Sequence, residues 1–161
     1  MQPDPELLEL SSRAGMALIE RRQTLAVAES CTGGLLGEAL TDVPGSSAYF
    51  VGGVIAYSNS VKIEQLGVSE ETIRTEGAVS AATALAMAEG VRALLHADIG
   101  LSITGVAGPA AEERKPAGLT FIGLASGTSE IERLQWSGDR WENRRHSVLA
   151  ALRLLVERLK V

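Results

Sequence analysis

Hydrophobic residues over 5–21 recur three or four positions apart, with polar and charged residues between them. This spacing puts them on one face of a helix, so we expect a helix over 5–21. The next hydrophobic run, 24–28, is short and uninterrupted, which is typical of a buried strand. The hydrophobic positions of 35–40 predict a second helix, and TDVPGSS (41–47) predicts a loop.

The same alternation continues along the rest of the chain. The pattern predicts strands over 51–57 and 99–104, a short helix to Leu66 capped by Ser58 or Asn59, and a helix over 81–95 capped by Ser80. A polar loop (107–118) precedes strands over 119–125 and 131–136, joined by SGTSE, and a last helix begins near Asp139. Strands that alternate with helices predict an α/β layered fold.

Composition limits the classes of protein to consider. The 161 residues, 45% hydrophobic and 22% charged, suit a single globular domain over 1–161. With only 4% aromatic residues, the core must consist mainly of Ala, Val, Leu and Ile. A net charge of −5 without a long basic run argues against nucleic-acid binding, but a local pocket for a small anion is still compatible.

Several observations favour a cytoplasmic location. The single cysteine, Cys31, cannot form an internal disulfide, which suits a reducing compartment. The start MQPDPELLEL lacks the basic-then-apolar pattern of a signal peptide, and no apolar run is long enough to span a bilayer. We therefore expect no membrane partner.

Three polar clusters follow predicted strands: AESCTGG (28–34), AYSNSVK (56–62) and SITGVAGP (102–109). Open α/β sheets bind ligands beyond the carboxyl ends of their strands. We therefore expect these three clusters to meet in one site.

Ser30 has two interpretations. Gly33 and Gly34 would expose backbone N–H groups at a helix N-terminus, which suits a phosphate or a developing oxyanion, and a serine there can be a nucleophile if a base is near. Ser30 or Thr32 can equally be a simple helix cap. The chain has no G-x-S-x-G motif. Cys31 is the other nucleophile candidate, but we favour a buried, inert thiol.

The base is harder to place. The two histidines, His96 and His146, lie away from the predicted strand ends, which argues against a Ser-His-Asp triad. A desolvated lysine can replace histidine, and Lys62 lies about one helical turn beyond a strand end. The alternative for Lys62 is a solvated helix lysine. Tyr57, which ends the same strand, is able to donate a hydrogen bond to Ser30 or to substrate, or else only to pack.

The remaining candidates would bind substrate. Thr104 precedes a glycine-containing turn in which Gly105 and Gly108 would let the backbone approach a ligand, or serve only the turn. Arg140 and Arg144, four residues apart on one helix face, are able to clamp a phosphate; the alternative is a surface helix whose arginines pair with Asp139 and Glu142. No sequence pattern of a metal site is present, so we expect no metal.

These motifs, in this order, resemble the CinA C-terminal domain family, which includes stand-alone nicotinamide-nucleotide amidohydrolases. The matching stretches are AESCTGG (28–34), VPGSS (43–47), GGVIAYSNSVK (52–62), LGV (66–68), GAVS (77–80), SITGVAGP (102–109), KPAG (115–118) and GDRWENR (138–144). The resemblance implies a three-layer α/β/α sandwich with a mixed sheet, which forms a homodimer or a higher homo-oligomer.

The resemblance also implies an activity: hydrolysis of the carboxamide of nicotinamide mononucleotide to nicotinate mononucleotide and ammonia, with no metal or organic cofactor. Ser30 matches the nucleophile and Lys62 the proposed base, with Tyr57 beside them. The positions expected to bind the small-molecule nucleotide substrate are Thr32, Gly33, Gly34, Asn59, Thr104, Gly105, Arg140 and Arg144.

Two features depart from the family pattern. The segment after AGP is commonly glycine-rich, but here it is AAEER (110–114). Many relatives carry an additional N-terminal domain, for which we expect no room in this chain. Two other functions therefore stay open: a nucleotide-binding module without catalysis, and an amidase for another substrate.

Overall fold

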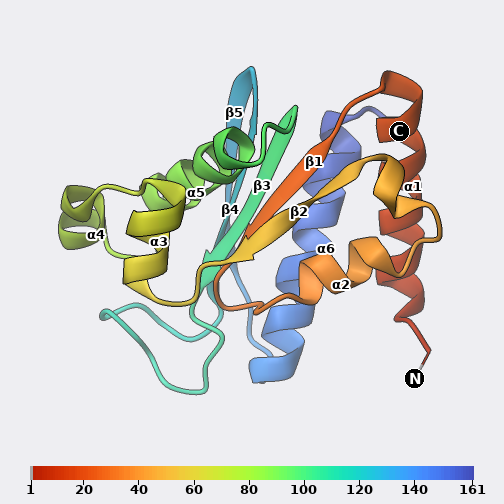
Figure 1. Cartoon of the computed structure of the whole chain (residues 1–161). Helices are drawn as coiled ribbons and strands as arrows, with labels where there is room; N and C mark the ends of the chain where they lie inside the picture. Colours follow the sequence, from red (N-terminus) through yellow and green to blue (C-terminus); the bar gives the residue numbers. More distant parts are fainter. Residues whose placement is uncertain (1) are drawn as a thin grey trace.

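The computed structural model describes residues 2–161. A five-stranded sheet has the order β2-β1-β3-β4-β5 (Figure 1). Its strands are β1 (Leu25–Glu29), β2 (Phe50–Ile55), β3 (Ile99–Gly105), β4 (Leu119–Ser126) and β5 (Thr128–Gln135). β1 pairs in parallel with β2 and β3, whereas β3 with β4 and β4 with β5 are antiparallel. The predicted mixed sheet is therefore confirmed.

Helices cover both faces of this sheet, so the predicted three-layer α/β/α sandwich is confirmed (Figure 1). The first layer holds α1 (Pro5–Arg21), α2 (Leu35–Thr41) and α6 (Arg140–Arg158), and the other layer holds α3 (Asn59–Leu66), α4 (Glu70–Glu76) and α5 (Ala81–Leu94). None of the described helices is long and apolar enough to cross a membrane.

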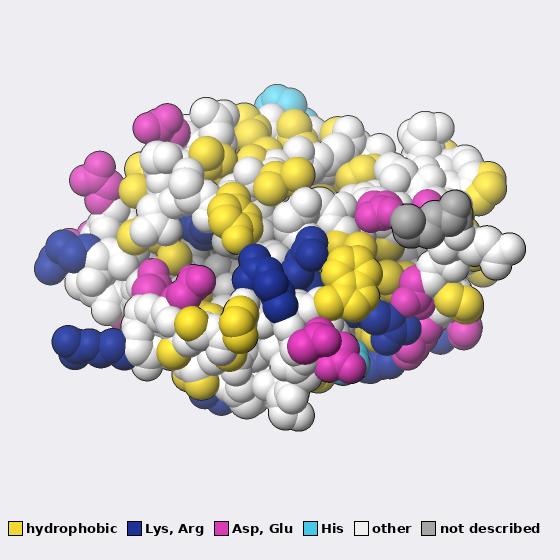
Figure 2. Space-filling model, turned by 90° about the horizontal axis from the view of Figure 1, so that it is seen from below, with side chains coloured by type: hydrophobic (Ala, Val, Ile, Leu, Met, Phe, Trp, Pro, Cys, Tyr) yellow, Lys and Arg dark blue, Asp and Glu magenta, His cyan; other side chains and the backbone are white. Residues whose placement is uncertain are grey.

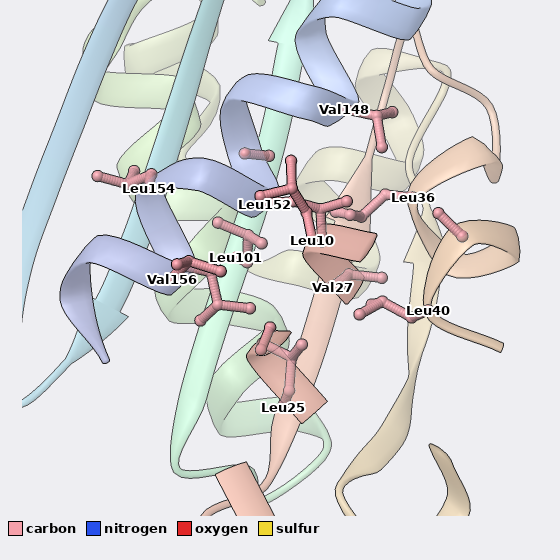
Figure 3. Close-up of a cluster of buried hydrophobic side chains, with 14 of the residues drawn as sticks. Leu10, Leu25, Val27, Leu36, Leu40, Leu101, Val148, Leu152, Leu154 and Val156 are labelled. Carbon is pink, nitrogen blue, oxygen red and sulfur yellow. The ribbon is translucent and has the colours of Figure 1, made fainter. Parts of the chain in front are cut away.

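The larger hydrophobic cluster lies between the sheet and the layer of α1, α2 and α6. Figure 3 shows aliphatic side chains of these helices meeting those of β1 and β3, such as Leu10, Leu101 and Leu152. A second, smaller cluster around Met87 and Val91 packs α5 against the opposite face. Both clusters are mainly aliphatic, as the low aromatic content predicts.

Most predicted elements are present within one or two residues of their expected ends. Ser58, not Asn59, caps α3, and Ser80 caps α5 as expected. The hairpin is tighter than SGTSE predicts, because Ser126 pairs with Thr128 and leaves Gly127 as the turn. We did not predict α4 from the sequence: none of its residues is buried, so it shows no hydrophobic periodicity, although Ser69 caps it and Glu70 and Glu71 lie in its first turn.

Candidate functional site

The carboxyl ends of the three parallel strands lie at one edge of the sheet, the lower edge in Figure 1, where α6 also begins. Figure 2 looks onto this edge and shows basic side chains side by side near its middle, with hydrophobic and acidic side chains around them. The segments that follow β1, β2 and β3 therefore meet at one edge, as predicted.

Ser30 and Lys62 are in direct contact at this edge. The Lys62 Nζ lies 2.9 Å from the Ser30 Oγ. Ser30 directly follows β1, and its N–H donates to the carbonyl of Ile103 on β3. Lys62 lies in the first turn of α3, and its amine reaches back to the carbonyls of Ala56 and Tyr57, which follow β2. In the described part of the chain, no histidine nitrogen is hydrogen-bonded to Ser30.

The burial of both groups changes their chemistry. Ser30 is 8% exposed and Lys62 only 1%, so the interpretation of Lys62 as a solvated lysine is wrong. Burial lowers the pKa of the Lys62 amine from its usual 10.5, against smaller opposing effects of Cys31 and Glu113. A neutral amine can donate its two N–H groups to the carbonyls of Ala56 and Tyr57, at 2.7 and 3.2 Å. Its lone pair is then free for the Ser30 hydroxyl proton.

Glu29, the residue before Ser30, has a structural role that we did not expect from the sequence. It is 2% exposed, and its carboxylate accepts four hydrogen bonds. The donors are the Thr32 hydroxyl at 2.6 Å and the backbone N–H groups of Gly34, Leu36 and Gly37 at 2.9–3.1 Å. The carboxylate therefore holds the turn after Ser30 and the start of α2.

This arrangement corrects two expectations about the turn. Neither Ser30 nor Thr32 caps α2, because its N-cap is Gly34, whose φ of 107° lies in the left-handed region. The N–H of Gly34 already donates to Glu29, and that of Gly33 to the Ser30 carbonyl. Within residues 2–161, the N–H groups of Cys31 and Thr32 donate no hydrogen bond to another residue, so these two groups of the turn are available to an oxyanion.

Cys31 itself is buried, as expected. The residue is 8% exposed, and burial raises the pKa of its thiol to about 12. A thiol with this pKa is protonated at neutral pH and is a poor nucleophile. Ser30 is therefore the nucleophile candidate in this turn.

The two arginines at the start of α6 reach the same edge. The Arg140 guanidinium donates to the Gly108 carbonyl at 2.7 Å and to the Tyr57 hydroxyl at 3.3 Å. Arg144 donates to the carbonyls of Cys31 and Thr32, at 3.2 and 2.9 Å. Arg144 thus adjoins the turn that carries Ser30, and Arg140 connects the segments after β2 and β3.

The structure contradicts the alternative in which Arg140 and Arg144 pair with Asp139 and Glu142. Asp139 and Glu142 form a capping box with the backbone of α6. Among the described residues, neither Arg140 nor Arg144 forms an ion pair. The Arg144 guanidinium instead lies 5.4 Å from the ring centre of the exposed Trp141.

A cavity of about 400 Å³ lies beyond Trp141, between the starts of α1 and α6 and helix α2. Its lining includes the acidic residues Asp4, Glu38 and Asp42, but neither Ser30 nor Lys62. These carboxylates disfavour an anion there, so Arg140 and Arg144 are the better place for a phosphate.

The other residues that we predicted to bind substrate lie in different environments. Thr104 is 1% exposed and donates to the Ala78 carbonyl at 2.7 Å, so its hydroxyl holds the segment before α5. Asn59 is exposed in the first turn of α3, and Gly105 ends β3. Asn143, which we did not predict, is buried and joins the Ala107 carbonyl to the Gly138 N–H.

The atypical segment AAEER lies in the loop between β3 and β4. Glu113 and Arg114 form the tip of a two-residue turn and have φ values of 51° and 61°, a conformation that usually favours glycine or asparagine. The Glu113 carboxylate accepts the N–H groups of Ala78 and Val79, at 3.0 and 3.2 Å. Burial alone would raise the pKa of Glu113, but these N–H groups and Lys115 lower it. The segment therefore fixes this loop to the start of α5.

In residues 2–161, no group of three or more His, Cys, Asp or Glu side chains is arranged to hold a metal ion. The Ser30–Lys62 contact is thus the chemically distinctive feature of the edge. Its environment is suited to activating a hydroxyl as a nucleophile.

Comparison with known proteins identifies relatives of this chain. A "putative competence-damage inducible protein" from Halothermothrix orenii is 53% identical over 154 residues, covering 94% of this chain and 37% of that protein. A "CinA-like protein" from Thermosynechococcus vestitus is 54% identical over 149 residues, covering 89% of this chain and 36% of that protein. The chain therefore spans little more than a third of the length of these relatives.

Solved structures show the same fold. The "competence/damage inducible protein CihA" from Agrobacterium tumefaciens superposes with a TM-score of 0.95 and 36% identity, with both chains fully covered. A CinA superfamily protein from Klebsiella pneumoniae gives 0.93 and 36%, covering 96% of this chain and 98% of that one. A family model described as "CinA C-terminal domain" matches residues 7–159, and the chain belongs to this family.

Proposed function

We propose that this protein is an amidohydrolase that converts nicotinamide mononucleotide to nicotinate mononucleotide and ammonia. The observation that carries the proposal is the 2.9 Å contact between the hydroxyl of Ser30 and the buried amine of Lys62. A serine beside a lysine whose pKa is lowered is a known arrangement for nucleophilic attack on a carbonyl. The resemblance to nicotinamide-nucleotide amidohydrolases supplies the substrate.

The first half of the reaction forms an ester. Neutral Lys62 takes the proton from Ser30 as the serine oxygen attacks the amide carbon. The N–H of Cys31 donates to the oxyanion, and loss of one such donor typically costs about 3–4 kcal/mol in the barrier. The carbon–nitrogen bond then breaks, and the proton held by Lys62 passes to the leaving nitrogen, which departs as ammonia.

The second half removes the acyl group. Lys62, again neutral, takes a proton from water as the water oxygen attacks the ester carbon. The carbon–oxygen bond to Ser30 breaks, and the proton on Lys62 returns to the serine oxygen. Tyr57 remains a second candidate proton donor to the leaving group, although 62% of it is exposed and its hydroxyl accepts from Arg140.

Arg140 and Arg144 hold the 5′-phosphate in this proposal. Each guanidinium has five N–H groups, and the contacts with Tyr57, Gly108, Cys31 and Thr32 use only part of them. Because neither arginine is paired with a described carboxylate, both retain their charge for a phosphate.

The direct test is ammonia release from nicotinamide mononucleotide, nicotinamide riboside and nicotinamide by the purified protein. We expect rapid release from the mononucleotide only, since the other two lack the phosphate that the arginines bind. Binding of the mononucleotide by calorimetry without ammonia would favour a non-catalytic nucleotide-binding module. Faster hydrolysis of another amide from a panel would favour an amidase whose specificity the AAEER loop has changed.

A further inference from the structure

The start of α2 is held differently from the starts of the other helices in residues 2–161. α3, α4 and α5 are each capped by the serine directly before them, and α1 and α6 by an aspartate. α2 has Gly34 at this position, which has no side chain that could accept a hydrogen bond from the N–H groups of the first turn. The acceptor comes instead from Glu29, five residues upstream at the end of β1.

Glu29 is also connected to the base. Its backbone carbonyl accepts the N–H of Ala56 at 2.7 Å, and the Ala56 carbonyl accepts from the Lys62 amine at 2.7 Å. Its side chain meanwhile accepts from Thr32 and the three N–H groups at the start of α2. Glu29 therefore links the turn that carries the nucleophile to the segment that fixes the base.

A carboxylate is well matched to this position. Its two oxygens have enough lone pairs for the four donors, and charged hydrogen bonds are stronger than neutral ones. A glutamine would present an NH₂ group to N–H donors on one side, so part of this network would be lost. The turn of Ser30 to Gly34 would then be free to relax away from Lys62.

We propose that Glu29 is a positioning residue: its carboxylate holds the turn so that the Ser30 Oγ stays against Lys62 and the Cys31 N–H stays free for the oxyanion. This inference rests on the proposed function. Glu29 itself contacts neither substrate nor the reacting atoms, and it acts through the residues of the turn. Misplacement of a reacting group by about 1 Å can cost about 10²-fold in rate.

The test uses Glu29→Gln, Thr32→Val and Thr32→Ser in the full chain. Valine has the shape of threonine but removes the hydroxyl that donates to Glu29, whereas serine keeps it. We expect Glu29→Gln to lower kcat for nicotinamide mononucleotide by about 10²-fold with KM within about twofold. Thr32→Val should lower kcat by a smaller factor. Thr32→Ser should keep most of the wild-type kcat.

Ser102→Ala is the matched control. Ser102 is a completely buried hydroxyl of β3 that donates to the Ala84 carbonyl at 2.5 Å, outside the Ser30 turn. We expect it to lower the melting temperature as much as Thr32→Val does and to leave kcat unchanged. An equal fall of kcat in Ser102→Ala, or the wild-type kcat in Thr32→Val, would overturn the inference.

A measurement made in the absence of substrate tests this inference independently of the proposed function. The ¹³Cε resonance of Lys62 in labelled protein reports its contact with Ser30. We expect its titration midpoint to move in Glu29→Gln and in Thr32→Val but not in Ser102→Ala; an unmoved midpoint in folded Glu29→Gln would contradict the positioning role. Absence of ammonia from the wild-type protein, with these shifts present, would count against the proposed function alone.

Discussion

The two groups of polar side chains at the carboxyl edge differ in burial and in how they are held. Ser30 and Lys62 are almost completely buried. The Ser30 N–H donates to the backbone of β3, and the Lys62 amine donates to the carbonyl of Ala56, directly after β2. Arg140 and Tyr57 are exposed and connected by a single 3.3 Å hydrogen bond. The buried pair is suited to bond breaking and the exposed group to binding. Substitutions in the buried pair should therefore change mainly kcat, and substitutions in the exposed group should change mainly KM.

The largest effect is expected from Ser30→Ala, because it removes the proposed nucleophile. We expect kcat for nicotinamide mononucleotide to fall by about 10⁴-fold or more, with binding of the mononucleotide retained in calorimetry. The alanine leaves the hydrogen bonds of Glu29 in place, so the fold should be kept, as circular dichroism would check. Ammonia release at the wild-type rate would remove Ser30 from the mechanism.

Lys62→Arg tests the other member of the buried pair. A guanidinium keeps the positive charge but cannot act as a base, so we expect kcat to fall by about 10²–10⁴-fold. In the wild-type protein, kcat/KM should rise with pH through the lowered pKa of Lys62, because only the neutral amine is active. That rising limb should be absent from the residual activity of Lys62→Arg. An active arginine variant would show that Lys62 is not the base.

Arg140→Gln tests the exposed group. The phosphate would lose one charged hydrogen-bond donor, which is typically worth about 1.5–3 kcal/mol, so we expect KM to rise by about 10–10²-fold. kcat should stay within about threefold, since Arg140 does not contact Ser30 or Lys62. Steady-state kinetics with the mononucleotide measure both values. A fall in kcat at constant KM would reverse the assignment of the two regions.

The smallest effect concerns stability and its dependence on pH. Lys62 has a lowered pKa in the folded protein, so between that pKa and 10.5 the unfolded chain binds more protons than the folded one. Stability of the wild-type protein should therefore rise with pH relative to Lys62→Met, by up to about 1.4 kcal/mol per pH unit in this window. Urea unfolding of both proteins at several pH values measures the difference. A difference that is constant with pH would contradict the lowered pKa.

The sequence predicts the position of the site because polar clusters follow three parallel strands, and a parallel sheet brings such ends together. It does not predict Glu29, since an acidic residue at a strand end resembles a solvated one until the start of α2 is placed against it. Thr104 shows the reverse: its position suggests a ligand-binding hydroxyl, but the segment before α5 lies over it and takes its hydrogen bond. The hydrogen-bond partner of a side chain depends on how distant segments pack together. The local sequence pattern therefore does not predict it.

The central claim is that the Lys62 amine beside Ser30 is neutral during the proposed hydrolysis. The most direct measurement is an NMR titration of protein labelled at lysine ¹³Cε, in which three lysines contribute and Lys62→Met identifies the resonance. The predicted result is a Lys62 midpoint below 10.5 that coincides with the rising limb of kcat/KM. A midpoint at or above 10.5 would leave the amine charged at the pH of turnover and contradict the account.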